Sequence, residues 1–141
     1  MSPFLIWNSH GVGARVKNDY IVSEVRMYKA VLVSVIKHKH RSDKIQEFSR
    51  RLKMHGAMHG APSNNHIWLF GKSGVSVTLW NVGDQVIMTK VTWNGLEWFM
   101  SFVYGSCDAR QREGLWAELD DFDSGDFPWI VGGDFNIVAG S

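Results

Sequence analysis

Apolar residues along this chain fall mainly into short runs typical of strands. The runs at 4–7, 31–36 and 128–131 are too short for helices and are bounded by polar or glycine residues, which indicates buried strands. The pair Asn94-Gly95 lies between two further apolar segments and predicts a hairpin, because both turn positions need positive φ. Similar turns containing glycine or asparagine separate a series of predicted strands at 66–70, 75–80, 85–93 and 96–104.

Helical spacing is clearest in two segments. In the segment 42–56, apolar residues recur at intervals of three and four after Ser42, which offers an N-cap. In the segment 110–122, Leu115, Leu119 and Phe122 share one helical face. A weaker helical pattern covers 19–30. Helices on either side of a run of antiparallel strands predict an α+β domain of the layered α/β type.

Length and composition are consistent with one globular domain over residues 1–141. Apolar residues make up 45% and charged residues 21% of the chain, which excludes a disordered or low-complexity protein. The single cysteine, Cys107, excludes a disulfide-rich secreted scaffold. The sequence contains no apolar run long enough to span a membrane, and the segment 1–8 lacks the features of a signal peptide. We therefore expect a protein inside the cell, in the nucleus or the cytoplasm, with no membrane partner.

Charge is distributed unevenly, although the formal net charge is only +1. Between residues 113 and 134 every charged residue is acidic. Basic residues dominate between 25 and 53, where only Asp43 and Glu47 oppose them. A local basic surface is sufficient for nonspecific nucleic-acid binding, so this region predicts a contact with a polyanion. The alternative is that both charged regions are solvated helix faces. The basic residues are Arg26, Lys29, Lys37, Lys39, Arg41, Lys44, Arg50, Arg51 and Lys53.

The last predicted strand leads into Gly132-Gly-Asp134-Phe-Asn136 and carries the main candidate chemistry. In extended backbone, Asp134 and Asn136 would project to the same side and Phe135 to the other. The carboxylate can then orient or deprotonate a water molecule, and the amide can bind an oxygen that gains charge. The alternative is an Asx turn in which Asp134 bonds to its own backbone.

Three segments, in order, carry a resemblance to a known family. They are Trp7-Asn8-Ser-His-Gly11, Phe102-Val-Tyr104-Gly-Ser106 and Gly133-Asp134-Phe-Asn136. Together they resemble the endonuclease/exonuclease/phosphatase superfamily. Their order and spacing, with Arg112 and Leu115-Trp116 after the tyrosine and Pro128-Trp129 before the aspartate, resemble most of all the endonuclease domain of plant non-long-terminal-repeat retroelements. The resemblance implies part of the four-layer α/β/β/α sandwich of the deoxyribonuclease I-like fold, with its C-terminal part missing.

The resemblance also implies roles for individual residues. Asn8 matches the asparagine near the metal and the scissile phosphate, and Tyr104 matches the tyrosine whose hydroxyl contacts the phosphate. Asp134 matches the aspartate that orients or deprotonates the attacking water, and Asn136 matches its partner on the phosphate. Arg112 is the candidate for substrate binding. The implied reaction is Mg²⁺-assisted hydrolysis of a phosphodiester, with DNA as the partner.

The chain departs from the family pattern at three places. Where the resemblance expects a metal-binding glutamate it has Lys37, which offers only hydrogen-bond donors and cannot ligate a hard cation. His10 replaces an arginine of the opening motif. The family's later Ser-Asp-His segment has no counterpart before Ser141. The resemblance therefore implies a truncated domain with impaired catalysis.

Three functional hypotheses follow, of which a small phosphomonoester phosphatase, allowed by the superfamily, is not favoured by the Leu115-Trp116 and Trp129 context. The first is a DNA-nicking endonuclease domain that is incomplete and impaired. The alternative is a non-catalytic retroelement remnant that binds nucleic acid or protein through its basic 26–53 region. An incomplete fold would also expose the apolar side chains of the strands between Val75 and Tyr104, and we expect self-association through them.

Overall fold

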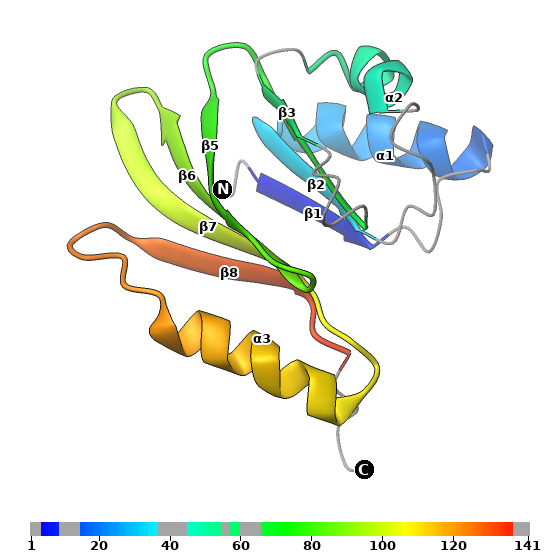
Figure 1. The fold of residues 1–141 in the computed structure, drawn as a ribbon. Helices are drawn as coiled ribbons and strands as arrows, with labels where there is room; N and C mark the ends of the chain where they lie inside the picture. Colours follow the sequence, from blue (N-terminus) through cyan, green and yellow to red (C-terminus); the bar gives the residue numbers. More distant parts are fainter. Residues whose placement is uncertain (1–3, 9–14, 37–44, 55–56, 60–65, 137–141) are drawn as a thin grey trace.

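Two sheets and three helices make up the part of the chain that the structure, a computed structural model, describes: residues 4–8, 15–36, 45–54, 57–59 and 66–136. The sheets have the strand orders β1-β2-β4-β3 and β5-β6-β7-β8 (Figure 1). The elements are β1 (Phe4–Asn8), α1 (Arg15–Tyr28), β2 (Leu32–Ile36), α2 (Ile45–Leu52), β3 (Ala57–His59), β4 (Ile67–Gly71), β5 (Ser76–Val82), β6 (Val86–Trp93), β7 (Leu96–Tyr104), α3 (Ala109–Asp121) and β8 (Trp129–Asp134).

The elements stack as four layers in the order helix, sheet, sheet, helix. Helices α1 and α2 cover the outer face of the first sheet, where Trp68 and Phe70 of β4 contact Phe48 of α2. Helix α3 covers the outer face of the second sheet through Leu115, which is buried beside Val103. The expected α+β fold of the layered type is therefore confirmed.

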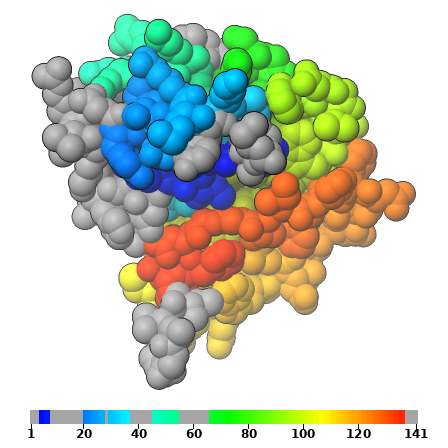
Figure 2. Space-filling model, turned by 180° about the vertical axis from the view of Figure 1, so that it is seen from behind, coloured from blue at the N-terminus to red at the C-terminus, as the bar shows by residue number. Residues whose placement is uncertain are grey.

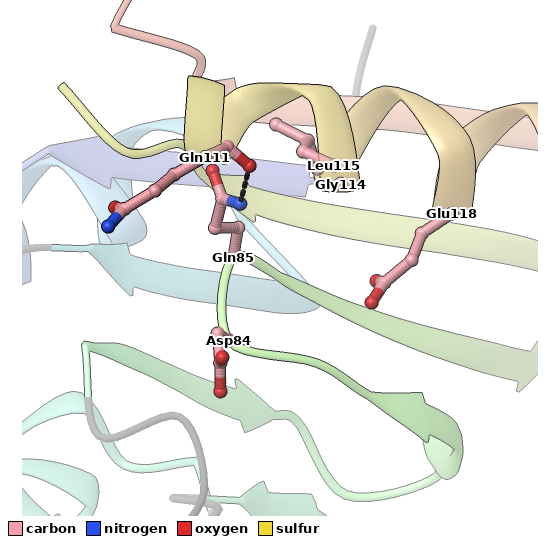
Figure 3. A pocket seen from close by; sticks show the side chains of 6 residues that line it. All are labelled: Asp84, Gln85, Gln111, Gly114, Leu115 and Glu118. Atoms are coloured by element: carbon pink, nitrogen blue, oxygen red, sulfur yellow. Dashed lines mark hydrogen bonds between the residues drawn. The ribbon is translucent and has the colours of Figure 1, made fainter. Parts of the chain in front are cut away.

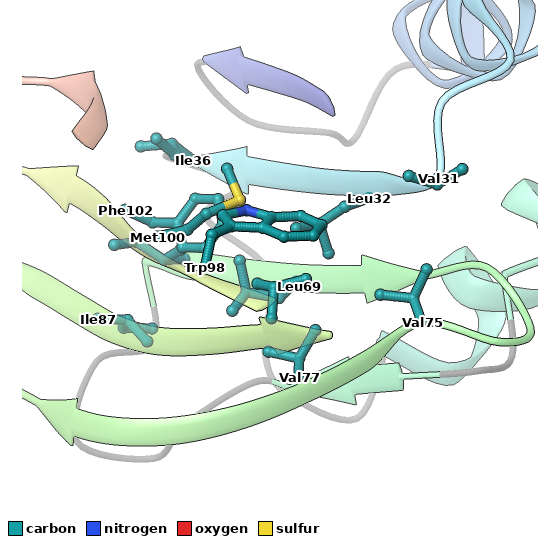
Figure 4. Packing of buried hydrophobic residues seen from close by; sticks show 12 residues of the cluster. Val31, Leu32, Ile36, Leu69, Val75, Val77, Ile87, Trp98, Met100 and Phe102 are labelled. Carbon is teal, nitrogen blue, oxygen red and sulfur yellow. The ribbon is translucent and has the colours of Figure 1, made fainter. Parts of the chain in front are cut away.

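The main core lies between the two sheets. Alternate residues of β7, namely Trp98, Met100 and Phe102, project toward the first sheet, where Leu32 and Leu69 face them (Figure 4). Each fully buried side chain of this size contributes about 1.5–3 kcal/mol relative to an exposed one. This period of two follows from the strand pleat, because successive side chains point to opposite faces.

The pairing of the sheets corrects one expectation. The strands between Val75 and Tyr104 do not lack a partner, because Val75, Val77 and Val91 are buried in the core that both sheets share. Exposed apolar side chains remain within these strands, at Trp80 and Leu96, and on edge strand β8, at Ile130 and Val131. Self-association through such residues stays a prediction.

Most predicted elements occur within a few residues of their expected bounds. The Asn94-Gly95 hairpin is confirmed, with φ values of 52° and 76° between the paired residues Trp93 and Leu96. The short strand β3 was not predicted. It pairs antiparallel with β4, and its three residues lie between Gly56 and Gly60, so the sequence shows no run of alternating residues that would predict a strand. Among the described ranges, no helix has the length and apolar character needed to cross a membrane.

The sheet register defines two ends of the sandwich. β1 and β2 are parallel, with Phe4 opposite Leu32 at one end and Asn8 opposite Ile36 at the other. The turn from β4 to β5 links the sheets at the first end. β8 runs beside β1, and the space-filling view shows this contact between the two sheets (Figure 2). The ends of β1, β7 and β8 therefore meet at the second end.

Candidate active site

Tyr104 and Asp134 are register partners at the carboxyl ends of the parallel strands β7 and β8. Pairing continues beyond the strand ends, because the N–H of Gly105 donates to the carbonyl of Asp134 at 2.7 Å. Residues opposite each other in adjacent strands project from the same face of the sheet. The pairing of β7 with β8 thus brings the phenol of Tyr104 and the carboxylate of Asp134 together at one end of the second sheet.

The segment 134–136 forms an Asx turn. Oδ1 of Asp134 accepts a hydrogen bond from the N–H of Asn136 at 2.9 Å, and Asn136 has a left-handed φ of 53°. Of the two alternatives that the sequence left open, the Asx turn is therefore the one present, because the local side-chain bond replaces the next step of the strand. The turn nevertheless keeps Asn136 at the site, where its Nδ2 donates to the carbonyl of Gly105 at 2.5 Å.

Gly105 allows this close approach. A β-carbon on Gly105 would lie 2.7 Å from the carbonyl oxygen of Phe135, a distance that real contacts do not reach. Any larger residue would push the Asx turn away from the end of β7. In the sequence, Gly105 stands out only as part of a motif, because its packing role depends on the pairing of β7 with β8.

Gln85 is a further residue that sequence reasoning missed. Its Oε1 accepts from the N–H of Ser106 at 2.7 Å, and its Nε2 donates to the carbonyl of Gln111 at 2.8 Å. Its own carbonyl accepts from the N–H of Tyr104 at 2.8 Å. One side chain thus fixes the loop after β7 to the first turn of α3 (Figure 3).

A cavity of about 290 Å³ opens beside Tyr104. His66, the residue before β4, lies against Tyr104 with its ring centroid 5.1 Å away and the rings nearly perpendicular. Because β4 pairs antiparallel with β2, its first residues lie at the same end as the last residues of β2. This antiparallel pairing brings a histidine to the site that no motif in the sequence identified.

A second cavity of about 390 Å³ continues from Gln85 along α3 to Glu118 (Figure 3). Burial raises the pKa of the Glu118 carboxyl above its usual range, and the negative charge of Asp84 raises it further. Among the described residues, Oε2 of Glu118 has no hydrogen-bond partner. The carboxylate lies over the turn before β6, since a β-carbon on Gly83 would meet its oxygens at 2.7 and 2.8 Å.

Cys107 lies on the loop that follows β7, and Arg112 lies in α3. The guanidinium of Arg112 donates to the carbonyls of Ser106 and Cys107, at 2.8 and 3.0 Å. Arg112 therefore closes the loop that follows β7, and its role in substrate binding stays a prediction. The thiol of Cys107 is exposed and free.

Asn8 ends β1 by its backbone position, opposite Ile36 of β2. β1 is held against β8 so closely that a β-carbon on Gly132 would lie 2.6 Å from Cδ1 of Ile6. The end of β1 therefore lies at the same end of the sandwich as the end of β8. Lys37 and His10 lie outside the described residues.

The described residues do not form a metal cage at this edge. No group of three or more histidine, cysteine, aspartate or glutamate side chains in the described ranges is placed to hold a metal ion. Mg²⁺ needs oxygen ligands, and the residue that directly follows β2 in sequence is Lys37, which has none. The side chains of the described residues thus do not fit an Mg²⁺ site of the kind that the resemblance implies.

Comparison with solved structures identifies the fold. The endonuclease domain of TRAS1, a telomere-specific non-LTR retrotransposon, is 11% identical with a TM-score of 0.69, over 96% of this chain and 61% of that domain. TDP2 from D. rerio complexed with a single-strand DNA product is 12% identical with a TM-score of 0.66, over 95% and 60%. The human Nocturnin catalytic domain with a bound sulfate anion is 18% identical with a TM-score of 0.59, over 97% and 66%.

The chain spans between 60% and 66% of the length of these three structures. No family model matches the sequence, and no curated protein matches it. By its similarity to the solved structures, the chain therefore has the deoxyribonuclease I-like fold.

Proposed function

We propose that this chain carries a phosphodiesterase site for DNA at the carboxyl ends of β1, β7 and β8, and that catalysis there is impaired. The observation that carries the proposal is the pairing of Tyr104 with Asp134, closed by the bonds of Gly105 to Asp134 and of Asn136 to Gly105. The pairing supports the roles that the resemblance assigns. TDP2, which shares the fold, has been crystallised with a DNA product.

Each residue of this edge has a chemical task in the proposal. The phenol of Tyr104 donates a hydrogen bond to a phosphate oxygen. Asp134 accepts a proton from the attacking water. The amide nitrogen of Asn136 carries a second hydrogen besides the one bonded to Gly105, and this hydrogen binds the phosphate as charge develops.

Lys37 is one of the three departures from the family pattern that support impairment. Lys37 directly follows the last residue of β2 in the sequence, and β2 pairs with the strand that ends at Asn8. A cation there repels a divalent ion instead of ligating it. Restoring a carboxylate at this position supplies an oxygen ligand, and Lys37→Glu should therefore nick DNA faster than the natural chain when Mg²⁺ is present.

Nicking of supercoiled plasmid in Mg²⁺ tests the proposal with four chains: the natural chain, Lys37→Glu, Asp134→Ala and the double variant. We expect Lys37→Glu to be the fastest. Removal of the proposed general base should lower its rate by about 10²–10⁴-fold. Nicking that is absent from Lys37→Glu, or that survives Asp134→Ala, would contradict the proposal. Absence from all four chains, with DNA binding retained, would favour the non-catalytic remnant.

A further inference from the structure

Helices α1 and α2 end in the same way, each with a lysine in left-handed backbone. Lys29 follows α1 with a φ of 51°, and Lys53 follows α2 with a φ of 57°. After each lysine, the next N–H returns to a carbonyl five residues back: Ala30 to Val25 at 3.1 Å, and Met54 to Ser49 at 3.2 Å. Both ends are Schellman motifs.

The left-handed position of this motif usually holds glycine, because a β-carbon there is strained. A lysine therefore costs stability relative to glycine at both helix ends. The helix dipole favours a cation near a C-terminus, but Arg26 already lies in the last turn of α1 and Arg50 and Arg51 in that of α2. A repeated unfavourable backbone conformation points to a role outside folding.

Lys29 and Lys53 line the same hollow, of about 250 Å³. Arg26 of α1 and Lys72, which follows β4, line it as well. The backbone of Lys72 is fixed there, because its N–H donates to the carbonyl of Val31 at 2.8 Å. Buried apolar residues of both helix ends, among them Leu52, line the rest. Three separate elements therefore bring four cationic side chains to one place.

A neighbouring hollow of about 440 Å³ extends this surface. It shares Arg26 with the first hollow and adds Arg51, together with the hydroxyl-bearing Ser23. Among the described residues, no acidic side chain lines either hollow. We name the five cationic residues the basic surface: Arg26, Lys29, Arg51, Lys53 and Lys72.

The basic surface lies at the end of the sandwich opposite the candidate active site. Lys72 follows Gly71, which pairs with Leu32, and Leu32 pairs with Phe4 at the start of β1. The candidate site lies at the Asn8 end, about 13 Å further along a strand of this length. A ligand on the basic surface therefore contacts a different part of the molecule from a phosphate at Tyr104.

We propose that the basic surface is a second, sequence-independent contact for nucleic acid, which binds successive phosphates of the backbone. Five positive charges over two adjacent hollows exceed what one phosphodiester neutralises, and match a chain of single negative charges. Lysine ammonium groups are flexible point charges, which suits contacts with phosphates in varying positions. The proposal does not depend on cleavage at Asp134.

The double variant Lys29→Gly and Lys53→Gly tests it, because glycine suits both left-handed positions. We expect the melting temperature to stay equal or rise. Fluorescence anisotropy with a labelled 20-bp duplex, without divalent ions, should show about tenfold weaker binding. The slope of log affinity against log salt concentration should flatten by about 2, since each lost phosphate contact removes about 0.9.

Charge-preserving and membrane controls complete the experiment. The variant Lys29→Arg and Lys53→Arg keeps both charges and should bind the duplex as the natural chain does. Unchanged affinity in the glycine variant, or equal loss in the arginine variant, would overturn the proposal. So would binding of the natural chain to phosphatidylserine vesicles but not to the duplex. The glycine variant retains Tyr104 and Asp134, so a nicking assay on it reports separately on the candidate active site.

Discussion

A β-carbon built on Gly133 would lie 2.1 Å from the carbonyl oxygen of Val103, the residue opposite it on β7. Gly133 also has a φ of 140°, a conformation that residues with side chains rarely adopt. The backbone of β8 thus approaches β7 as closely as only glycine allows, one residue before Asp134. This approach sets where the carboxylate lies relative to Tyr104.

We expect Gly133→Ala to lower the free energy of unfolding by about 2 kcal/mol or more, through backbone strain and the contact with Val103. Gly114→Ala is the matched control. Nothing lies within 4 Å of a β-carbon there, inside α3, so alanine should stabilise by about 0.5–1 kcal/mol. Urea denaturation measures the free energy of unfolding of both variants. A change of the same sign in the two variants would contradict the expected role of Gly133.

Gln85→Ala should lower the free energy of unfolding by about 1–3 kcal/mol, because two hydrogen bonds of about 0.5–1.5 kcal/mol each are lost. The bonds join the loop after β7 to α3, so the backbone amide of Ser106 should also exchange with solvent faster. Gln46→Ala, at an exposed position of α2, serves as the control. Equal stability of the two variants would show that the bridge contributes nothing.

Glu118→Gln should change how stability depends on pH. The pKa of this carboxyl is raised in the folded protein, so the folded state binds more protons than the unfolded state just above the usual value of 4.5. Stability of the natural chain therefore falls as pH rises through this window, and the ionised carboxylate remains unfavourable at pH 7. Because the glutamine side chain cannot ionise, the stability of Glu118→Gln does not fall for this reason as the pH rises.

Thermal unfolding from pH 4 to 8 measures this difference. Glu118→Gln should be more stable than the natural chain at pH 7, with the advantage lost toward pH 4. Glu113→Gln, at an exposed position of the same helix, should show no such pattern. Parallel stability curves for Glu118→Gln and the natural chain would contradict the proposed cause.

Local patterns predicted the elements of this fold better than the contacts within its site. The hairpin at Asn94-Gly95 could be predicted, because the turn needs positive φ at both adjacent residues. The Asx turn of Asp134 stood beside extended backbone as an open alternative, and a single local hydrogen bond decides between them. Gln85 could not be found, since its partners Ser106 and Gln111 lie 21 and 26 residues away.

The measurement that tests the central claim most directly is NMR titration of the ¹⁵N-labelled chain with thymidylyl-thymidine, the smallest DNA phosphodiester. We predict that the largest amide shifts occur at Gly105, Ser106 and Asn136, and that they persist in the variant Lys29→Gly and Lys53→Gly. Shifts that are absent from these amides while others respond would contradict the claim that the ends of β7 and β8 receive the phosphate.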